Sequence, residues 1–229
     1  NDPAAWLECT NPAVYSNLTP GQHTFQVRAA DAGDNIDPTP ATHTWTVGTP
    51  TTCEEANITL IAVEDGFVDE MLPLNNFGIS VALLVRSHTP GANARSLVRF
   101  ELPAGLPDCA LERATLRLYG EGDAGRTLQA IPLAGAWQQN QVTWNNQPAT
   151  TGPPATTSSG SGYREWNVTD HVAALIAGDP NHGWLIRDAV EEDAAGGEQA
   201  FRSRESINAP STPPQLVLRF EDSGTPPPP

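Results

Sequence analysis

The side chains that most often perform catalysis form no recognisable motif in this sequence. A serine nucleophile on a sharp strand-to-helix turn would give a G-x-S-x-G pattern, and none occurs. The five histidines show no spacing typical of zinc ligands, such as H-E-x-x-H. The 27 acidic residues leave one alternative, a pair of carboxylates that hydrolyses glycosides, although any acidic surface offers such pairs. We therefore predict a protein that is not an enzyme.

Carboxylate-rich segments suggest a different chemistry, the binding of a hard cation. Ca²⁺ takes about six to eight oxygen ligands, which flexible loops supply most easily. Asp65, Asp69 and Glu70 lie close together in the sequence, and we expect them to lie on one loop that could hold a structural Ca²⁺. The acidic segments 31–37 and 188–193 are alternatives. Each of these segments can also be read as a solvated loop that keeps the chain soluble.

Arginines that alternate with apolar residues suggest a third chemistry, the recognition of sugars that carry carboxylates. Arginine forks bind carboxylates, and aromatic rings stack on sugars. Alternation in 97–102 and 114–119 directs Arg99, Arg117 and Tyr119 away from the core. Arg187 shows a weaker alternation of the same kind. If these strands are neighbours, they form one arginine-bearing outer face. The alternative is that each arginine pairs with a carboxylate across strands.

Composition limits the partners of the chain. The 229 residues include 27 acidic and 12 basic side chains, which gives a formal charge of −15, and every basic residue is arginine. Nucleic acids and anionic membranes need a basic footprint, which this charge does not provide. No apolar run approaches the ~20 residues of a membrane span. We predict no nucleic-acid partner and no membrane insertion.

Short extended segments recur through residues 53–221, and we predict an all-β fold. Turn-rich stretches separate the segments, as in sandwiches and jelly rolls. One helix is expected over 169–177, with Thr169 or Asp170 as its cap and Gly178 at its end. The expected strands are 58–63, 81–87, 96–102, 114–119, 127–132, 163–168, 183–187, 200–203 and 215–220.

Three cysteines in an acidic, proline-rich chain indicate an oxidising, extracytoplasmic setting. Cys53 and Cys109 each precede a strand-like segment, and we predict that they form a disulfide worth about 4 kcal/mol in the chain-entropy model. Cys9 is left over. Three free buried thiols are the alternative.

Two parts of the chain differ in pattern. Residues 1–48 resemble the C-terminal half of bacterial immunoglobulin-like repeats, with a strand at 23–29, an acidic loop at 31–38 and a strand at 42–47. We expect a partial immunoglobulin-like β-sandwich there, a linker at 49–52, a second domain at 53–221 and a stiff proline-rich linker at 222–229.

The order of segments in the second part resembles the DNRLRE-domain family of secreted bacterial and archaeal proteins, some of which are classed as alginate-binding carbohydrate-binding modules. This resemblance implies a jelly-roll β-sandwich, an extracellular role without catalysis, and Arg187 and Arg204 as ligand contacts or buried ion-pair partners. The matching segments are 65–70 with 75–78, 95–102, 114–119, 137 with 142–149, 166–169, 183–188, 201–205 and 214–218.

We therefore expect an extracellular or bacterial cell-surface module that binds polysaccharide, with polymers of uronic acids as the hypothesised ligand. The expected contacts are Arg99, Arg117, Tyr119, Arg187 and Arg204. The alternative is a structural or adhesive unit that contacts neighbouring surface-protein chains and has no small ligand.

Overall fold

A computed structural model describes residues 18, 21–29, 35–47, 57–104, 106, 109–206 and 212–221. The chain divides into two compact units, Asn1–Thr51 and Thr52–Pro229. The predicted linkers at 49–52 and 222–229 lie outside the described residues, as do Cys9 and Cys53. Cys109 is half-buried against the main core, and its pairing with Cys53 stays a prediction.

The first unit contains an antiparallel hairpin of β1 (Gly21–Val27) and β2 (Ala41–Val47). Alternation places ring side chains on one face, as the period of a strand requires. His23 and His43 stack on Trp45 with centroid distances of 5.8 and 5.7 Å. The immunoglobulin-like character of this unit stays a prediction.

The second unit is built almost entirely from strands, with one short helix, α1 (Thr169–Ile176). Its strands are β3 (Ile58–Ile61), β4 (Glu64–Asp69), β5 (Ala82–Arg86), β6 (Ala94–Arg99), β7 (Ala110–Gly122), β8 (Thr127–Pro132), β9 (Ala155–Ser158), β10 (Gly162–Asn167), β11 (Trp184–Asp188), β12 (Glu198–Arg202) and β13 (Gln215–Glu221). All the strand pairs between the described residues are antiparallel.

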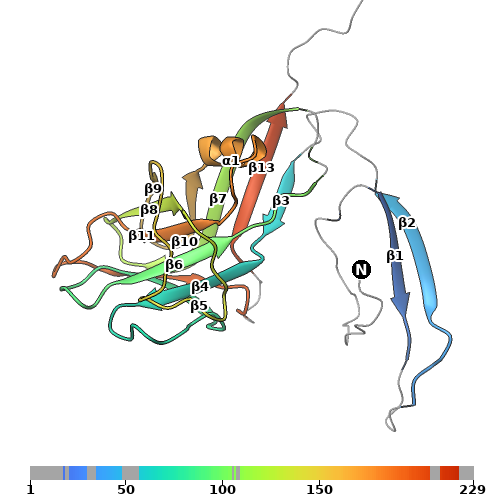
Figure 1. Ribbon diagram of the computed structural model, residues 1–229, viewed down its shortest axis with the longest axis horizontal. Coiled ribbons are helices and arrows are strands. Elements are labelled where there is room, and N and C mark those ends of the chain that lie inside the picture. The colour runs from blue at the N-terminus through green and yellow to red at the C-terminus, as the bar shows by residue number, and fades with distance from the viewer. Residues whose placement is uncertain are drawn as a thin grey trace, which may run out of the picture. The chain divides into compact units, whose positions relative to one another are not determined.

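These strands curl into two facing layers. The first layer contains β3, β13 and β7 side by side, with β10 on the other edge of β7 (Figure 1). The second layer contains β4, β6, β11, β8 and β9. β12 pairs with β7 of the first layer and with β5, and β5 pairs with β6 of the second layer at Arg86 and Ala94, so β12 and β5 connect the layers at one side. The second unit is a β-sandwich, as predicted.

Alternate residues of each layer point into one shared core. The core includes Leu116 and Leu218 from the first layer and Phe100 and Ile186 from the second. Trp166 is fully buried, and its Nε1 donates to the carbonyl oxygen of Leu128 at 3.1 Å. A buried indole that keeps its hydrogen bond adds apolar area without an unsatisfied donor.

The segment 133–150, which we call the covering segment, packs a second small core against the outer face of the second layer. This core joins Val68, Leu97 and Leu185 from strands to Trp137 and Val142 from the covering segment. Because the covering segment buries these outward side chains, much of that face of the second layer is closed to solvent.

Three local expectations need correction. Residues 64–69 form a strand, β4, rather than a loop, and β9 was not predicted. Neither Thr169 nor Asp170 caps α1. Val168 is the N-cap residue without a side-chain bond, and Asn167 Oδ1 accepts from the Thr169 backbone at 3.2 Å. No helix in the described part of the chain is long and apolar enough to cross a membrane.

Candidate functional site

The outer face of the first layer is open to solvent, in contrast to the covered face of the second. Its outward side chains on β7, β10 and β13 are exposed or half-buried, and none is buried. On β7 the alternation that buries Leu116 and Leu118 turns Thr115, Arg117 and Tyr119 outward. The predicted orientation of Arg117 and Tyr119 is therefore confirmed.

Strand register sets the neighbours of these side chains. Arg117 lies opposite Gln215 on β13 and opposite Glu165 on β10. Tyr119 lies opposite Tyr163 on β10. Directly opposed residues in an antiparallel pair have Cβ atoms about 5 Å apart, so these side chains must interact.

Two arginines and two tyrosines form a continuous row of contacts on this face. The Arg117 guanidinium carbon lies 4.0 Å from the centre of the Tyr163 ring. The Tyr163 and Tyr119 rings meet edge to face, with centroids 5.1 Å apart at an interplanar angle of 77°. The guanidinium carbon of Arg202 on β12 lies 4.8 Å from the centre of the Tyr119 ring. We call Arg117, Tyr163, Tyr119 and Arg202 the arginine–tyrosine strip.

Glu165, the carboxylate that pairs with Arg117 of the strip, is weakly held. Arg117 Nε lies 3.2 Å from Glu165 Oε1, with the two side chains 29% and 52% exposed. The Arg117 Nε–H is not aligned for a hydrogen bond to any partner. An exposed ion pair of this kind is worth at most about 1 kcal/mol. A ligand carboxylate that aligned with the guanidinium could therefore replace Glu165.

This arrangement has the features of a sugar-binding face. Cation–π contacts hold both guanidinium groups against the rings, which limits their freedom before a ligand arrives. The half-buried tyrosines offer apolar ring area, and Gln215 and Thr115 offer groups that bond hydroxyls.

Two predicted contacts, Arg99 and Arg187, do not belong to this face. Arg99 lies on β6 and Arg187 on β11, both in the second layer. Arg99 pairs with Glu64 at 2.9 Å. Arg187 Nε donates to Gln129 Oε1 at 3.0 Å. The expectation of one shared outer face is wrong, because β6 and β7 are not neighbours.

Arg204 lies just beyond β12, outside the strip. Its backbone N–H donates to Asp65 Oδ2 at 2.8 Å. Its Nη1 donates to the Val63 carbonyl oxygen and to Gln139 Oε1. These contacts show that Arg204 joins β4 to the covering segment.

The three predicted metal ligands do not converge. In a strand, Asp65 and Asp69 are separated by about 13 Å, at ~3.3 Å per residue. Asp69 pairs with Arg86 at 2.7 Å, and Glu70 Oε2 accepts from Asn93 Nδ2 at 2.6 Å. Among the described residues no group of three or more His, Cys, Asp or Glu side chains is placed to hold a metal ion.

Asp65 is a fully buried carboxyl. Loss of hydration is the main cause that raises the pKa of Asp65 to about 7. The nearby Glu205 carboxyl adds to this rise, while the Arg204 backbone N–H opposes it.

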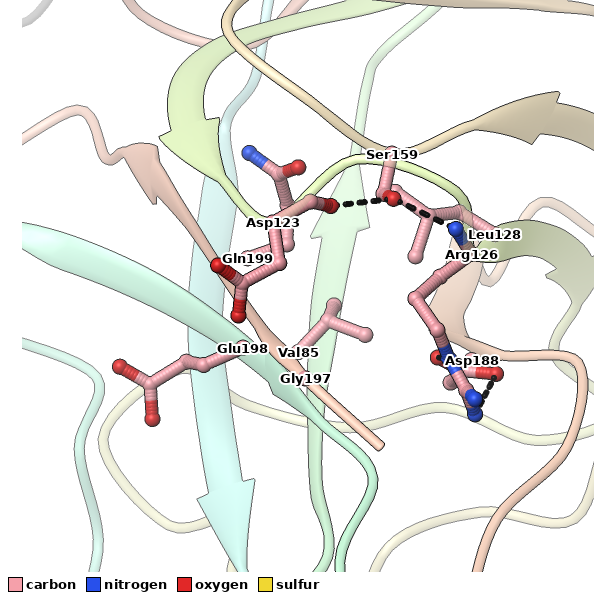
Figure 2. Close-up of a pocket in the computed structure, with 9 residues that line it drawn as sticks. All are labelled: Val85, Asp123, Arg126, Leu128, Ser159, Asp188, Gly197, Glu198 and Gln199. Carbon is pink, nitrogen blue, oxygen red and sulfur yellow. Dashed lines mark hydrogen bonds and ion pairs between the residues drawn. The ribbon is translucent and has the colours of Figure 1, made fainter. Parts of the chain in front are cut away.

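The acidic stretch 188–193, an alternative calcium segment, is held by arginine instead. Arg126 donates to both oxygens of Asp188, at 2.8 and 3.0 Å, and to Asp193 at 2.7 Å. Figure 2 shows Arg126 reaching Asp188 at a shallow pocket, with Ser159 bonded to the Asp123 carbonyl oxygen. These bonds raise the pKa of Arg126 and lower the pKa of Asp193. In the 31–37 segment, 31–34 lie outside the described residues, and Asp37 accepts from Thr39 at 2.8 Å.

Comparison with known proteins decides the family. Residues 56–220 match the model of carbohydrate-binding module family 96. The chain belongs to this family. The match contains the whole arginine–tyrosine strip, and a family-96 module is generally non-catalytic. A search of curated proteins finds no match.

The family match tests neither the DNRLRE resemblance nor the immunoglobulin-like one, and both stay predictions. Sequence reasoning missed two residues of the strip, Tyr163 and Arg202. Tyr163 alternates with the buried Trp166 and Val168, so its outward direction could have been inferred. Its position beside Tyr119 depends on the pairing of β10 with β7, which the sequence does not reveal.

Proposed function

We propose that this chain is an extracellular or bacterial cell-surface module that binds polysaccharides of uronic acids through the arginine–tyrosine strip. The row of ring contacts from Arg117 to Arg202 on an open sheet face supports this proposal most strongly. Membership of a carbohydrate-binding family supports the sugar class of the ligand. Acidic composition and three cysteines support the extracellular setting.

Uronic acids fit the strip because each sugar carries one carboxylate beside its hydroxyl groups. Arginine binds carboxylates with two parallel hydrogen bonds, which neutral sugars cannot accept in the same way. Two guanidinium groups held by neighbouring tyrosines would contact carboxylates of one chain. The strip includes no lysine, which would bind as a flexible point charge instead.

Calorimetric titration with oligosaccharides tests this proposal. We expect binding to oligomers of mannuronate, guluronate or galacturonate and weaker binding to neutral cello- and manno-oligosaccharides. Arg117→Gln should weaken uronate binding by about 10- to 100-fold, because a hydrogen bond to a charged group is worth ~1.5–3 kcal/mol. Tyr163→Ala should weaken it similarly, since it removes the ring that holds Arg117.

Arg219→Gln is the matched control. Arg219 is an outward arginine on the same layer, and it pairs with Glu112 outside the strip. This variant should bind as the wild type does. Equal affinity of Arg117→Gln and wild type for every uronate oligomer would refute the proposal. If no glycan binds and the chain self-associates, a structural or adhesive role is favoured.

A further inference from the structure

Arg117 does not bind its carboxylate in the way that Arg95 does. Arg95 Nε and Nη2 donate to the two carboxylate oxygens of Glu191, each at 2.7 Å, which is the geometry of two parallel hydrogen bonds. Arg117 Nε lies 3.2 Å from Glu165 Oε1, yet its N–H is not aligned with any acceptor. The Arg117–Glu165 pair is therefore a contact of opposite charges without the hydrogen bonds that make such pairs strong.

The Tyr163 ring accounts for this geometry. Tyr163 and Glu165 point outward from β10 together, because they are two residues apart in one strand. The Arg117 guanidinium carbon lies 4.0 Å from the centre of the Tyr163 ring. The guanidinium is thus held against the ring rather than in line with the carboxylate. Since the Arg117 side chain is 29% exposed, its donors can be reached by a carboxylate that comes from solvent.

Glu165 places a negative charge where that carboxylate would bind. It lies directly opposite Arg117 in the strand register, and its side chain is 52% exposed. Because Glu165 is attached to the sheet, its effective concentration beside Arg117 is high, on the order of mM. A ligand carboxylate must displace it, and the ligand and Glu165 then remain close together as two like charges.

We propose that Glu165 limits the affinity of the arginine–tyrosine strip for uronates, as a built-in competitor that pairs with Arg117 until a ligand carboxylate displaces it. This inference rests on the proposed function, since it takes Arg117 to be the group that binds the uronate carboxylate. Binding is then an exchange of one carboxylate for another at the same guanidinium. The free energy of the original ion pair is lost in this exchange, so the affinity is lower than an unpaired Arg117 would give.

Calorimetric titration of the full chain with a mannuronate hexasaccharide tests the inference. Glu165→Gln nearly keeps the size of the side chain and removes its charge. We expect this variant to bind about 2- to 5-fold more tightly than the wild type, the factor that corresponds to an exposed ion pair. In the Arg117→Gln background the same substitution should give no gain, because the guanidinium for which the two carboxylates compete is absent.

Glu112→Gln is the matched control. Glu112 is a carboxylate on the same layer, and it pairs with Arg219 at 3.1 Å outside the strip. Its replacement changes the net charge of the chain by the same amount as Glu165→Gln. The affinity of this variant for the hexasaccharide should equal that of the wild type.

Unchanged or weaker binding by Glu165→Gln would overturn the inference, and weaker binding would show that Glu165 accepts hydrogen bonds from sugar hydroxyls instead. An equal gain in Glu112→Gln or in the Arg117→Gln background would also overturn it, because net charge alone would then explain the effect. The proposed function survives these results as long as Arg117→Gln binds more weakly than the wild type. If neither the wild type nor Glu165→Gln binds a uronate, the proposed function and this inference fail together.

Discussion

His171 is fixed in one neutral form by its two hydrogen bonds. Trp184 Nε1 donates to His171 Nδ1 at 3.1 Å, so that nitrogen must carry no proton. Nε2 lies 3.0 Å from the Pro153 carbonyl oxygen, which only accepts, so Nε2 is the donor. Burial is the main cause that lowers the pKa of His171 below its usual value of 6.5.

This contact predicts a loss of stability in mild acid. Because the unfolded chain binds a proton on His171 more readily, the free energy of unfolding should fall as pH falls below about 6.5. His171→Gln removes the titrating group and should make the decrease between pH 7.5 and 5 smaller. Urea denaturation at each pH measures the difference.

His88→Gln is the control, because the His88 side chain is exposed and its Nδ1 is hydrogen-bonded to the neighbouring Thr89 hydroxyl. It should retain the pH dependence of the wild type. The same pH dependence in His171→Gln and wild type would show that His171 does not carry the effect.

Single residues show where sequence reasoning succeeds. Alternation with buried leucines correctly placed Arg117 and Tyr119 on the outside. The alternative reading, in which outward arginines pair with carboxylates, holds for Arg219, which pairs with Glu112 at 3.1 Å. The ion-pair partners of Arg99 and Arg117 proved to be Glu64 and Glu165. These partners come from strands 35 and 48 residues away in the chain (99 − 64 and 165 − 117), and pairing over such distances leaves no local signal.

At the scale of elements, the covering segment determines which sheet face is open. Trp137 is 9% exposed, packs in the second core and donates from Nε1 to the His182 carbonyl oxygen at 2.8 Å. Gly78 lies directly against this segment, since a Cβ there would lie 1.9 Å from the Gln139 carbonyl oxygen.

Trp137→Ala should therefore loosen the covering segment. We expect a loss of about 3–5 kcal/mol in the free energy of unfolding, as for other buried tryptophans. Hydrogen exchange should show faster exchange for segment amides such as Ala134, while the amides of β7 stay protected. Gln138→Ala, an exposed neighbour, is the control. A loss below about 1 kcal/mol would mean that this tryptophan does not anchor the segment.

The strand β4 was predicted to be a loop, and its residues show why that prediction failed. Its sequence includes Glu64, Asp65 and Asp69, which favour loops when read alone. The structure compensates these acids with Arg99, Arg86 and the Arg204 backbone. Because the compensating groups lie far away in the sequence, the strand becomes evident only in the folded chain.

Across the whole molecule, positive charge is scarce and mostly paired. The formal charge is −15, and the arginines of the described residues that form ion pairs include Arg86, Arg95, Arg99, Arg117, Arg126, Arg187 and Arg219. Long-range attraction of a polyanion is therefore not expected. The proposed binding of uronates would therefore depend on short-range contacts at the strip.

The fold class was predictable from the sequence, because short alternating segments with frequent turns can bury their apolar faces only in a sandwich. The sequence did not predict that the expected contacts would lie on two different sheet faces. Arg99 and Arg117 alternate in the same way with apolar neighbours, yet they point out of opposite layers. The order of the strands in the sheets sets this difference, and the local sequence pattern gives no information about strand order.

The most direct test of carbohydrate binding on the first layer is amide chemical-shift mapping with a uronate hexasaccharide. The account predicts saturable shifts concentrated at 115–119, 163–165 and 202, with the amides of 95–99 and 185–187 unchanged. Shifts concentrated on the second layer or the covering segment, with the strip unaffected, would contradict it.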